Sequence, residues 1–216
     1  MKIAAVQMVS GTDVRRNSDA AQRLIGGTLP IRGDDPERVL NSNCVYAPDG
    51  TLAARYDKIH LFRYDNGSEH YDEGCTILAG STPTTVQAGP LRVGLSVCYD
   101  LRFPELYREL SFAAGAPPCD LISVPAAFTY TTGLAHWELL LRARAVENQC
   151  YVIAAAQGGR HENGRRTFGH SMVVDPWGEV LGVLPEGEGV VLAEIDPALI
   201  ASVRVQLPAL THRRVG

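Results

Sequence analysis

Lysine is scarce in this chain of 216 residues, and long apolar runs are missing. Lys2 and Lys58 are the only lysines among the 20 residues that are Lys or Arg. No apolar stretch approaches the roughly 20 residues of a membrane-spanning helix, and the run after Met1 is too short for a signal peptide. The net charge of −4 is not gathered into blocks, which disfavours nucleic acids and anionic membranes as partners. The sequence therefore predicts a soluble globular protein.

Paired cysteines are also missing. The five cysteines, at 44, 75, 98, 119 and 150, form neither a Cys-x-x-Cys motif nor a Cys/His cluster of the zinc-binding kind. We therefore expect reduced thiols, a cytoplasmic location and no bound metal. The apolar fraction of 45% and the charged fraction of 20% are ordinary for globular proteins. The length suits one domain over residues 1–216.

Short apolar strands alternate with a few helices along the chain, which predicts an α/β or α+β fold with stacked layers. Hairpins are expected around the turns at 48–50, 88–90 and 175–178. Polar, irregular loops are expected at 57–80, a candidate active-site region, and at 158–166. Helices are predicted at 13–25, 105–114, 136–148 and after Asp196, and further strands at 3–8, 28–31, 121–124, 151–157 and 189–195.

Cys98 lies where a predicted strand gives way to a predicted helix. Pro104 suits the first position of a helix, and Glu105 suits its first turn. Such a junction lifts a side chain out of the sheet and points backbone N–H groups at the group that the side chain attacks. A lone cysteine at the end of an apolar strand is more often a small buried hydrophobe. The polar residues after Cys98 nevertheless favour a ligand site, because ligands bind at strand exits in layered α/β folds.

A cysteine nucleophile reacts as the thiolate, so it needs a cation or a base beside it. Lys58, at the exit of a hairpin strand, is one candidate, although a solvated surface lysine is an equally good interpretation. Glu73 is either a loop carboxylate or a group that orients Lys58. His136 and His170 leave a Cys–His hydrolase open as a second kind of enzyme.

Six stretches together resemble the nitrilase, or carbon–nitrogen hydrolase, superfamily. They lie at 3–8, 56–62, 98–106, 132–138, 142–149 and 169–178, and the stretches around Lys58 and Cys98 are highly specific. The His-Trp-Glu stretch at 136–138 and the Gly-His-Ser stretch at 169–171 most resemble the branch of deaminated glutathione amidases. The resemblance to the omega-amidases is nearly as strong, and nitrilases and carbamoyl hydrolases are further alternatives.

The resemblance implies a four-layer α-β-β-α sandwich of the nitrilase type, and a homodimer that extends the layers. It implies a Glu–Lys–Cys triad with Cys98 as nucleophile, Lys58 as its cation and Glu73 as a supporting carboxylate. Lys58 and the N–H of Tyr99 would hold the oxyanion, and the amide would be hydrolysed through a thioester without a metal or an organic cofactor. The residues that could contact a small amide substrate are Arg102, Phe128, Tyr130 and His136.

One departure from the family pattern concerns its general-base glutamate. The family has this glutamate after the second strand, whereas here Ile25 runs into Gly26 and a later strand, and the first glutamate is Glu37. A segment is therefore missing between 25 and 26, either omitted from the sequence or lost. A loss would remove a core strand and leave unpaired sheet edges and an open core. It would also favour the alternative of a pseudoenzyme, a nitrilase-fold binding protein without the base.

Overall fold

The computed structural model describes residues 1–10, 13, 28–112 and 115–214. Its central element is a six-stranded sheet in the order β15-β14-β11-β10-β9-β8. The middle strands β9, β10 and β11 are parallel, and the outer pairs are antiparallel. The bounds of these strands are β8 (Thr84–Ala88), β9 (Leu91–Leu95), β10 (Leu121–Ser123), β11 (Tyr151–Ala154), β14 (Ser171–Val174) and β15 (Val180–Leu184).

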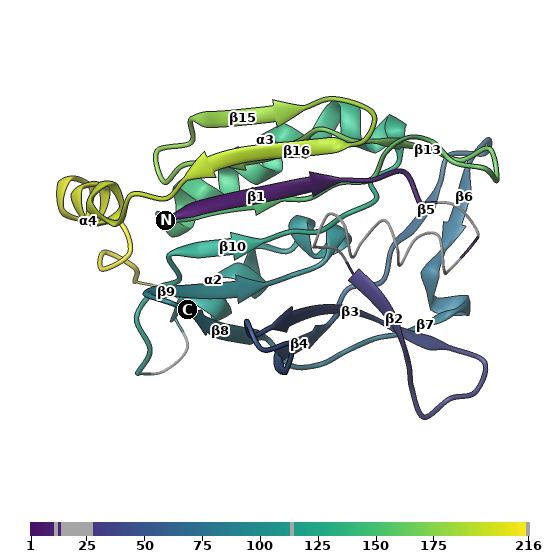
Figure 1. The fold of residues 1–216 in the computed structure, drawn as a ribbon, viewed down its shortest axis with the longest axis horizontal. Helices are drawn as coiled ribbons and strands as arrows, with labels where there is room; N and C mark the ends of the chain where they lie inside the picture. Colours follow the sequence, from purple (N-terminus) through teal and green to yellow (C-terminus); the bar gives the residue numbers. More distant parts are fainter. Residues whose placement is uncertain (11–12, 14–27, 113–114, 215–216) are drawn as a thin grey trace.

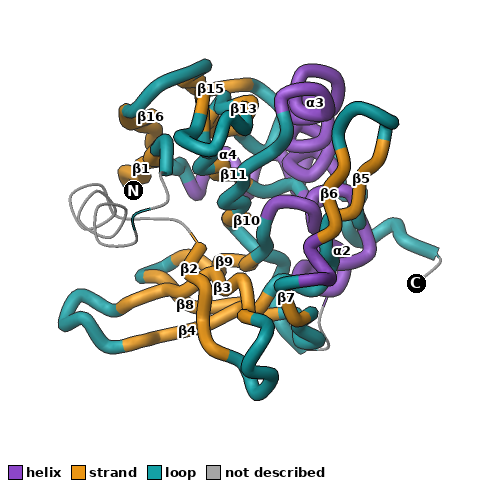
Figure 2. Tube along the Cα trace, turned by 90° about the vertical axis from the view of Figure 1, so that its right-hand side faces the viewer, coloured by secondary structure: helices purple, strands orange, loops and turns teal. Residues whose placement is uncertain are grey.

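Two helices cover one face of this sheet. Figure 2 shows α2 (Pro104–Phe112) and α3 (Tyr130–Asn148) together on one side of β9, β10 and β11. Leu110 of α2 and Leu141 of α3 are buried in the main core with the sheet residues. Gly94 of β9 permits this close contact, because an added Cβ would lie 3.3 Å from the Leu110 side chain. A small residue in the strand thus sets how near α2 lies to the sheet.

Further strands lie against the opposite face. The pair of β1 (Lys2–Gln7) and β16 (Gly189–Glu194) shares a small apolar cluster with β14, formed by Ala5, Val173 and Val191. A four-stranded sheet contains β2 (Thr28–Arg32), β3 (Val39–Tyr46), β4 (Leu52–Asp57) and β7 (Ile77–Leu78). In Figure 1, this four-stranded sheet lies at the bottom of the molecule, and β1 and β16 lie near the top.

The two regions predicted as irregular loops contain regular structure, so that part of the prediction is wrong. Residues 57–80 include β5 (Arg63–Asp65), β6 (His70–Asp72), the 3-10 helix η1 (Glu73–Cys75) and β7. Residues 158–166 include β12 (Gly158–Arg160) and the start of β13 (Arg166–Phe168). The strands β5, β6, β12 and β13 have three residues each and pair with near neighbours, and β7 has only two residues. Such short strands leave little apolar alternation to detect. The three predicted hairpins are confirmed.

The long helix α3 begins at Tyr130, six residues before the predicted start at His136. Thr129 ends the preceding loop, and its hydroxyl accepts a hydrogen bond from the backbone N–H of Thr132, which is an N-cap that the apolar pattern does not reveal. The predicted start of α2 at Pro104 is confirmed. So is the helix after Asp196, α4 (Pro197–Gln206), where the Asp196 carboxylate caps Ala198.

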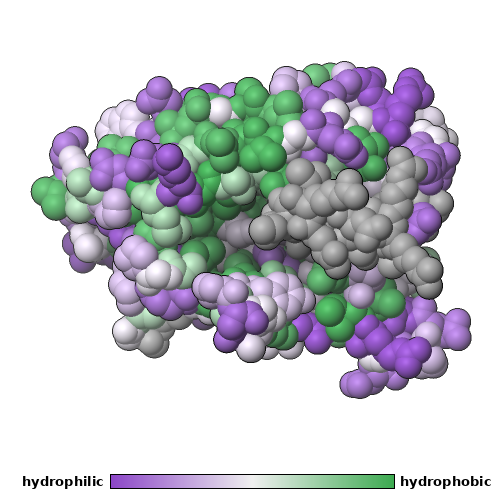
Figure 3. Space-filling model, viewed as in Figure 1, coloured by the Kyte–Doolittle hydropathy of each residue, from purple (hydrophilic) through white to green (hydrophobic). Residues whose placement is uncertain are grey.

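The outer surface of β15 and β16 is apolar. Figure 3 shows hydrophobic side chains gathered in that part of the molecule, and the exposed ones there are Leu181, Val183, Val190 and Leu192. The predicted helix at 13–25 lies outside the described residues, apart from Asp13. Over the part of the chain that the structure describes, each helix is too short or too polar to cross a membrane.

Candidate active site

Cys98 lies on a strained turn at the carboxyl edge of the parallel strands. Its φ of 51° is left-handed, a conformation that residues other than glycine rarely adopt and that is concentrated at functional sites. Cys98 opens the 3-10 helix η2 (Cys98–Arg102), and α2 follows. The loop after the neighbouring strand β10 holds the turn, since the Cys98 N–H donates to the Pro125 carbonyl over 2.9 Å. The side chain is half-buried, so it lies at the surface of the sheet edge.

Lys58 is fully buried and forms an ion pair with Glu73. The surface-lysine interpretation is therefore wrong. The same Glu73 oxygen accepts the N–H of Phe62 over 2.7 Å, which fixes the carboxylate at the start of η1. A buried charge is tolerated only when it is paired and hydrogen-bonded. The structure thus shows a buried ammonium group that Glu73 holds in place.

Asp100 links the segment of Lys58 to the turn of Cys98. Its buried carboxylate accepts hydrogen bonds from the Val97 N–H and the Tyr56 hydroxyl, both over 2.8 Å. It also accepts the N–H of His60 over 3.1 Å, and the His60 ring nitrogen lies 2.7 Å from it. Tyr56 and His60 lie on either side of Lys58 in sequence. One carboxylate therefore fixes the position of Lys58 relative to Cys98.

Burial raises the pKa of the Cys98 thiol above its ordinary value. The charge of Lys58 is the strongest influence in the other direction, and the backbone N–H of Ala127 and the charge of Arg165 also lower this pKa. The negative charge of Glu73 raises it. Since burial outweighs the cations, the resting group is a thiol, and a proton must leave it during reaction.

Three of the four predicted substrate contacts lie together. The Arg102 guanidinium carbon is 5.3 Å from the Phe128 ring centroid, and an Arg102 nitrogen is 3.2 Å from the His136 ring nitrogen. Tyr130 belongs to a separate group, because its ring packs on Phe168 and under the guanidinium of Arg166. The structure therefore brings Arg102, Phe128 and His136 together, whereas the ring contacts of Tyr130 are with Phe168 and Arg166.

Neither candidate histidine is among the groups that act on the Cys98 thiol. His136 contacts Arg102, and His170 stacks on Phe168 at 3.9 Å between ring centroids, with a ring nitrogen 2.9 Å from the Phe168 carbonyl oxygen. This geometry does not support a Cys–His pair. Within the described residues, no group of three or more His, Cys, Asp or Glu side chains is arranged to hold a metal ion.

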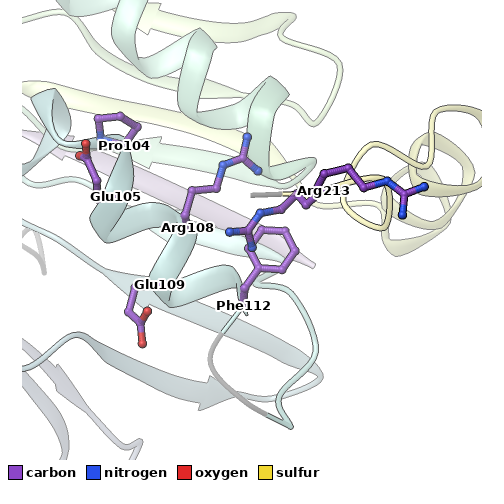
Figure 4. A pocket seen from close by; sticks show the side chains of 7 residues that line it. Pro104, Glu105, Arg108, Glu109, Phe112 and Arg213 are labelled. Carbon is purple, nitrogen blue, oxygen red and sulfur yellow. The ribbon is translucent and has the colours of Figure 1, made fainter. Parts of the chain in front are cut away.

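A hollow of about 700 Å³ lies on the outer side of α2. Figure 4 shows its charged lining, with Arg108 from α2 and with Arg213, whose guanidinium carbon is 4.1 Å from the Phe112 ring centroid. Cys98 and Lys58 do not line this hollow. The hollow is therefore separate from the candidate nucleophile.

Two groups at the site were not predicted as site residues. Arg165 lies between β12 and β13, in a stretch predicted only as a polar loop, and the N–H of Ala127 follows β10. A signal for Ala127 exists in the sequence, because residues just after neighbouring parallel strands meet at one sheet edge. Arg165 reaches the site from a hairpin far along the chain, which no local pattern indicates.

Comparisons with known proteins identify the family of the chain. The model of the carbon–nitrogen hydrolase family matches residues 3–205. A deaminated glutathione amidase of Yersinia enterocolitica is 46% identical over 191 residues, which are 87% of this chain and 65% of that protein. The human omega-amidase NIT2 is 39% identical over 213 residues, 96% of this chain and 75% of that protein.

Solved structures show the same fold. The crystal structure of the Caenorhabditis elegans NitFhit protein has a TM-score of 0.88 and 34% identity, and the match covers 99% of this chain and 65% of that one. The chain thus spans about two thirds of the length of these relatives. The predicted α/β fold of the nitrilase-type sandwich is confirmed. From the family match and this identity over most of its length, the chain belongs to the carbon–nitrogen hydrolase family.

Proposed function

We propose that the protein is a cysteine-dependent amidase that hydrolyses a small carboxylate-bearing amide, of the deaminated glutathione kind, to an acid and ammonia. The observation that carries this proposal is the buried Lys58, paired with Glu73 and acting electrostatically on the half-buried Cys98. The names of the relatives support the same reaction class. A cytoplasmic location is part of the proposal, and the five free thiols are consistent with it.

In the proposed reaction, the Cys98 sulfur attacks the amide carbonyl carbon. A carbon–sulfur bond forms, the carbon–nitrogen bond breaks, and the thiol proton leaves with the amine as ammonia. Water then cleaves the thioester to the carboxylic acid and restores the thiol. Lys58 and the N–H of Tyr99 are proposed to stabilise the oxyanion, with Glu73 holding Lys58 in place. The reaction as written requires neither a metal nor an organic cofactor.

The test is ammonia release from a panel of small amides, including succinamate, glutaramate and uncharged amides. Cys98→Ala should abolish release, and Lys58→Ala should reduce kcat by at least about 100-fold, as the loss of an oxyanion-stabilising group does. Cys44→Ala is the matched control, because Cys44 is a free thiol in β3 that is not among the groups acting on Cys98. Retention of most activity in Lys58→Ala would contradict the assignment of Lys58.

The alternative function is a nitrilase-fold binding protein without activity, and the junction that motivates it, between Ile25 and Gly26, lies outside the described residues. An intact mass compared with 23.4 kDa separates the two cases. A heavier chain indicates an omitted segment and favours the enzyme. A chain of this mass that forms no thioester and releases no ammonia from any amide supports the binding protein.

We also propose a homodimer that uses the outer surface of α3. Leu139 and Val146 are 66% and 47% exposed, and seven residues apart they share one helix face. Trp177 is 61% exposed in the turn between β14 and β15. Arg142 joins this turn to α3, since it donates to the Gly178 carbonyl over 2.8 Å. The three apolar side chains therefore belong to one continuous exposed surface.

A further inference from the structure

The guanidinium of Arg165 lies at the same sheet edge as Cys98. Its Nη2 donates to the Ala127 carbonyl over 2.8 Å, and the N–H of the same Ala127 is the backbone donor that acts on the Cys98 thiol. Its central carbon is 5.4 Å from the ring centroid of Tyr71, in the strand β6 that leads to Glu73. The guanidinium thus contacts both the loop after β10 and the strand β6.

Arg165 forms no ion pair with a described carboxylate, whereas Arg144 and Arg166 each have one. Its Nε is buried and has no hydrogen-bond partner, and no carboxylate of the described residues lies within ion-pair distance of it. Arg166, the next residue, is paired with Glu186 at the surface. Since a guanidinium offers five donors in a planar fork, the site leaves several donors and a full charge available for an anion.

Lys58 cannot take this role, because its ammonium is already paired with Glu73. Arg102 also has no ion pair among the described residues, but its guanidinium contacts His136 and lies over the rings of Phe128 and Tyr99. Arg165 is a second cation, one that acts on Cys98 and whose charge no described carboxylate balances. Arginine binds carboxylates through two parallel hydrogen bonds, and the proposed amide substrate carries a carboxylate.

We propose that Arg165 binds the carboxylate of the substrate at the end remote from the scissile amide. Arg165 is then a specificity-determining residue, which selects omega-amides of dicarboxylic acids over uncharged amides of the same length. This inference rests on the proposed function, since it names the substrate class of the same site. The guanidinium N–H groups that are not already hydrogen-bonded supply the donors, while the bond to Ala127 fixes their direction.

The first experiment compares glutaramate with pentanamide, which has a methyl group where glutaramate has its carboxylate. Arg165→Met should lower kcat/KM for glutaramate about 30-fold, mainly through KM, as the loss of a charged hydrogen bond does. The value for pentanamide should change less than about threefold, and Arg165→Lys should recover part of the loss. Arg160→Met, an exposed position of the same hairpin, is the control and should behave like the wild type. An equal loss on both amides, or none on glutaramate, would overturn the inference.

The second experiment does not depend on turnover. Glutarate should slow the alkylation of Cys98 by iodoacetamide in the wild type and in Arg160→Met, and should have no effect in Arg165→Met. Mass spectrometry of the Cys98 peptide measures this. If glutarate protects Cys98 from alkylation but the chain hydrolyses no amide, the proposed function is rejected and the inference about Arg165 is retained. Hydrolysis of glutaramate without protection by glutarate, and without dependence on Arg165, would keep the function and reject the inference.

Discussion

At the scale of single residues, two effects on Cys98 oppose each other. Burial disfavours the thiolate, and the charge of Lys58 favours it. Burial alone would leave Cys98 unreactive, and Lys58 partly offsets it. The ammonium itself is held by Glu73 and is shielded from water. Asp100 accepts hydrogen bonds from both segments, so the cation and the sulfur cannot separate without breaking a buried network. Reactivity here depends on position as much as on residue type.

The pH dependence of Cys98 alkylation tests this balance. Because the thiol pKa is raised, the alkylation rate with iodoacetamide should continue to rise with pH beyond the ordinary cysteine range. Lys58→Met removes the strongest influence that lowers this pKa, so its profile should move to higher pH and its rate at pH 8 should fall severalfold. Lys2→Met, which removes the other lysine at an exposed position, is the control. Superimposable profiles for wild type and Lys58→Met would show that Lys58 does not act on the sulfur.

At the scale of elements, the position of α3 depends on a glycine. An added Cβ at Gly133 would lie 2.3 Å from the Cβ of Phe168, in β13. The first turns of α3 can therefore approach β13 only because residue 133 has no side chain. This contact also matters for the site, since Arg165 immediately precedes β13.

Gly133→Ala should lower the free energy of unfolding by about 1–3 kcal/mol, as overpacking a core does. Helix propensity alone predicts the opposite, a gain of about 1 kcal/mol for alanine in a helix. Urea denaturation gives the sign directly. Glu138→Ala, on the exposed side of the same helix, is the control and should change stability by less than about 0.5 kcal/mol. A stabilised Gly133→Ala protein would mean that α3 and β13 are packed less tightly than described.

At the scale of the whole molecule, the exposed apolar side chains of the described residues include two sets that could form an interface. One lies on the outer side of α3 with Trp177, and the other lies on β15 and β16. Exposed patches of this kind are often interaction surfaces. The proposed homodimer uses the first surface, where an interface would extend the layers from one subunit to the next.

Light scattering coupled to size exclusion tests the dimer. The wild type should have twice the mass of the 23.4 kDa chain, and Leu139→Glu should shift it toward the monomer, because an interface buries its central residues away from water. Leu192→Glu places the same charge on the other apolar surface, where the side chain is 73% exposed, and should remain dimeric. A monomeric wild type, or dissociation by Leu192→Glu alone, would reject the proposed interface.

The sequence by itself determined the local elements and the family. Alternating residues around Asp-Gly and similar turns predict the hairpins, and Pro104 predicts the start of α2, because these features depend on backbone preferences of near neighbours. The specific stretches around Lys58 and Cys98 indicate the carbon–nitrogen hydrolase family, which the comparisons confirm. Short strands such as β5 and β12 are not predicted from the sequence, since three residues are too few to show an alternation of apolar and polar side chains.

Only the tertiary structure decided how the distant residues meet. The residues around Lys58 in sequence are equally compatible with a surface lysine. Lys58 is buried because Asp100 hydrogen-bonds to His60, 40 residues away along the chain, and so connects the segment of Lys58 to the turn of Cys98. Arg165 reaches the site from a later hairpin. The physical reason is that burial, charge balance and hydrogen-bond partners depend on contacts between segments far apart in sequence, which local patterns do not encode.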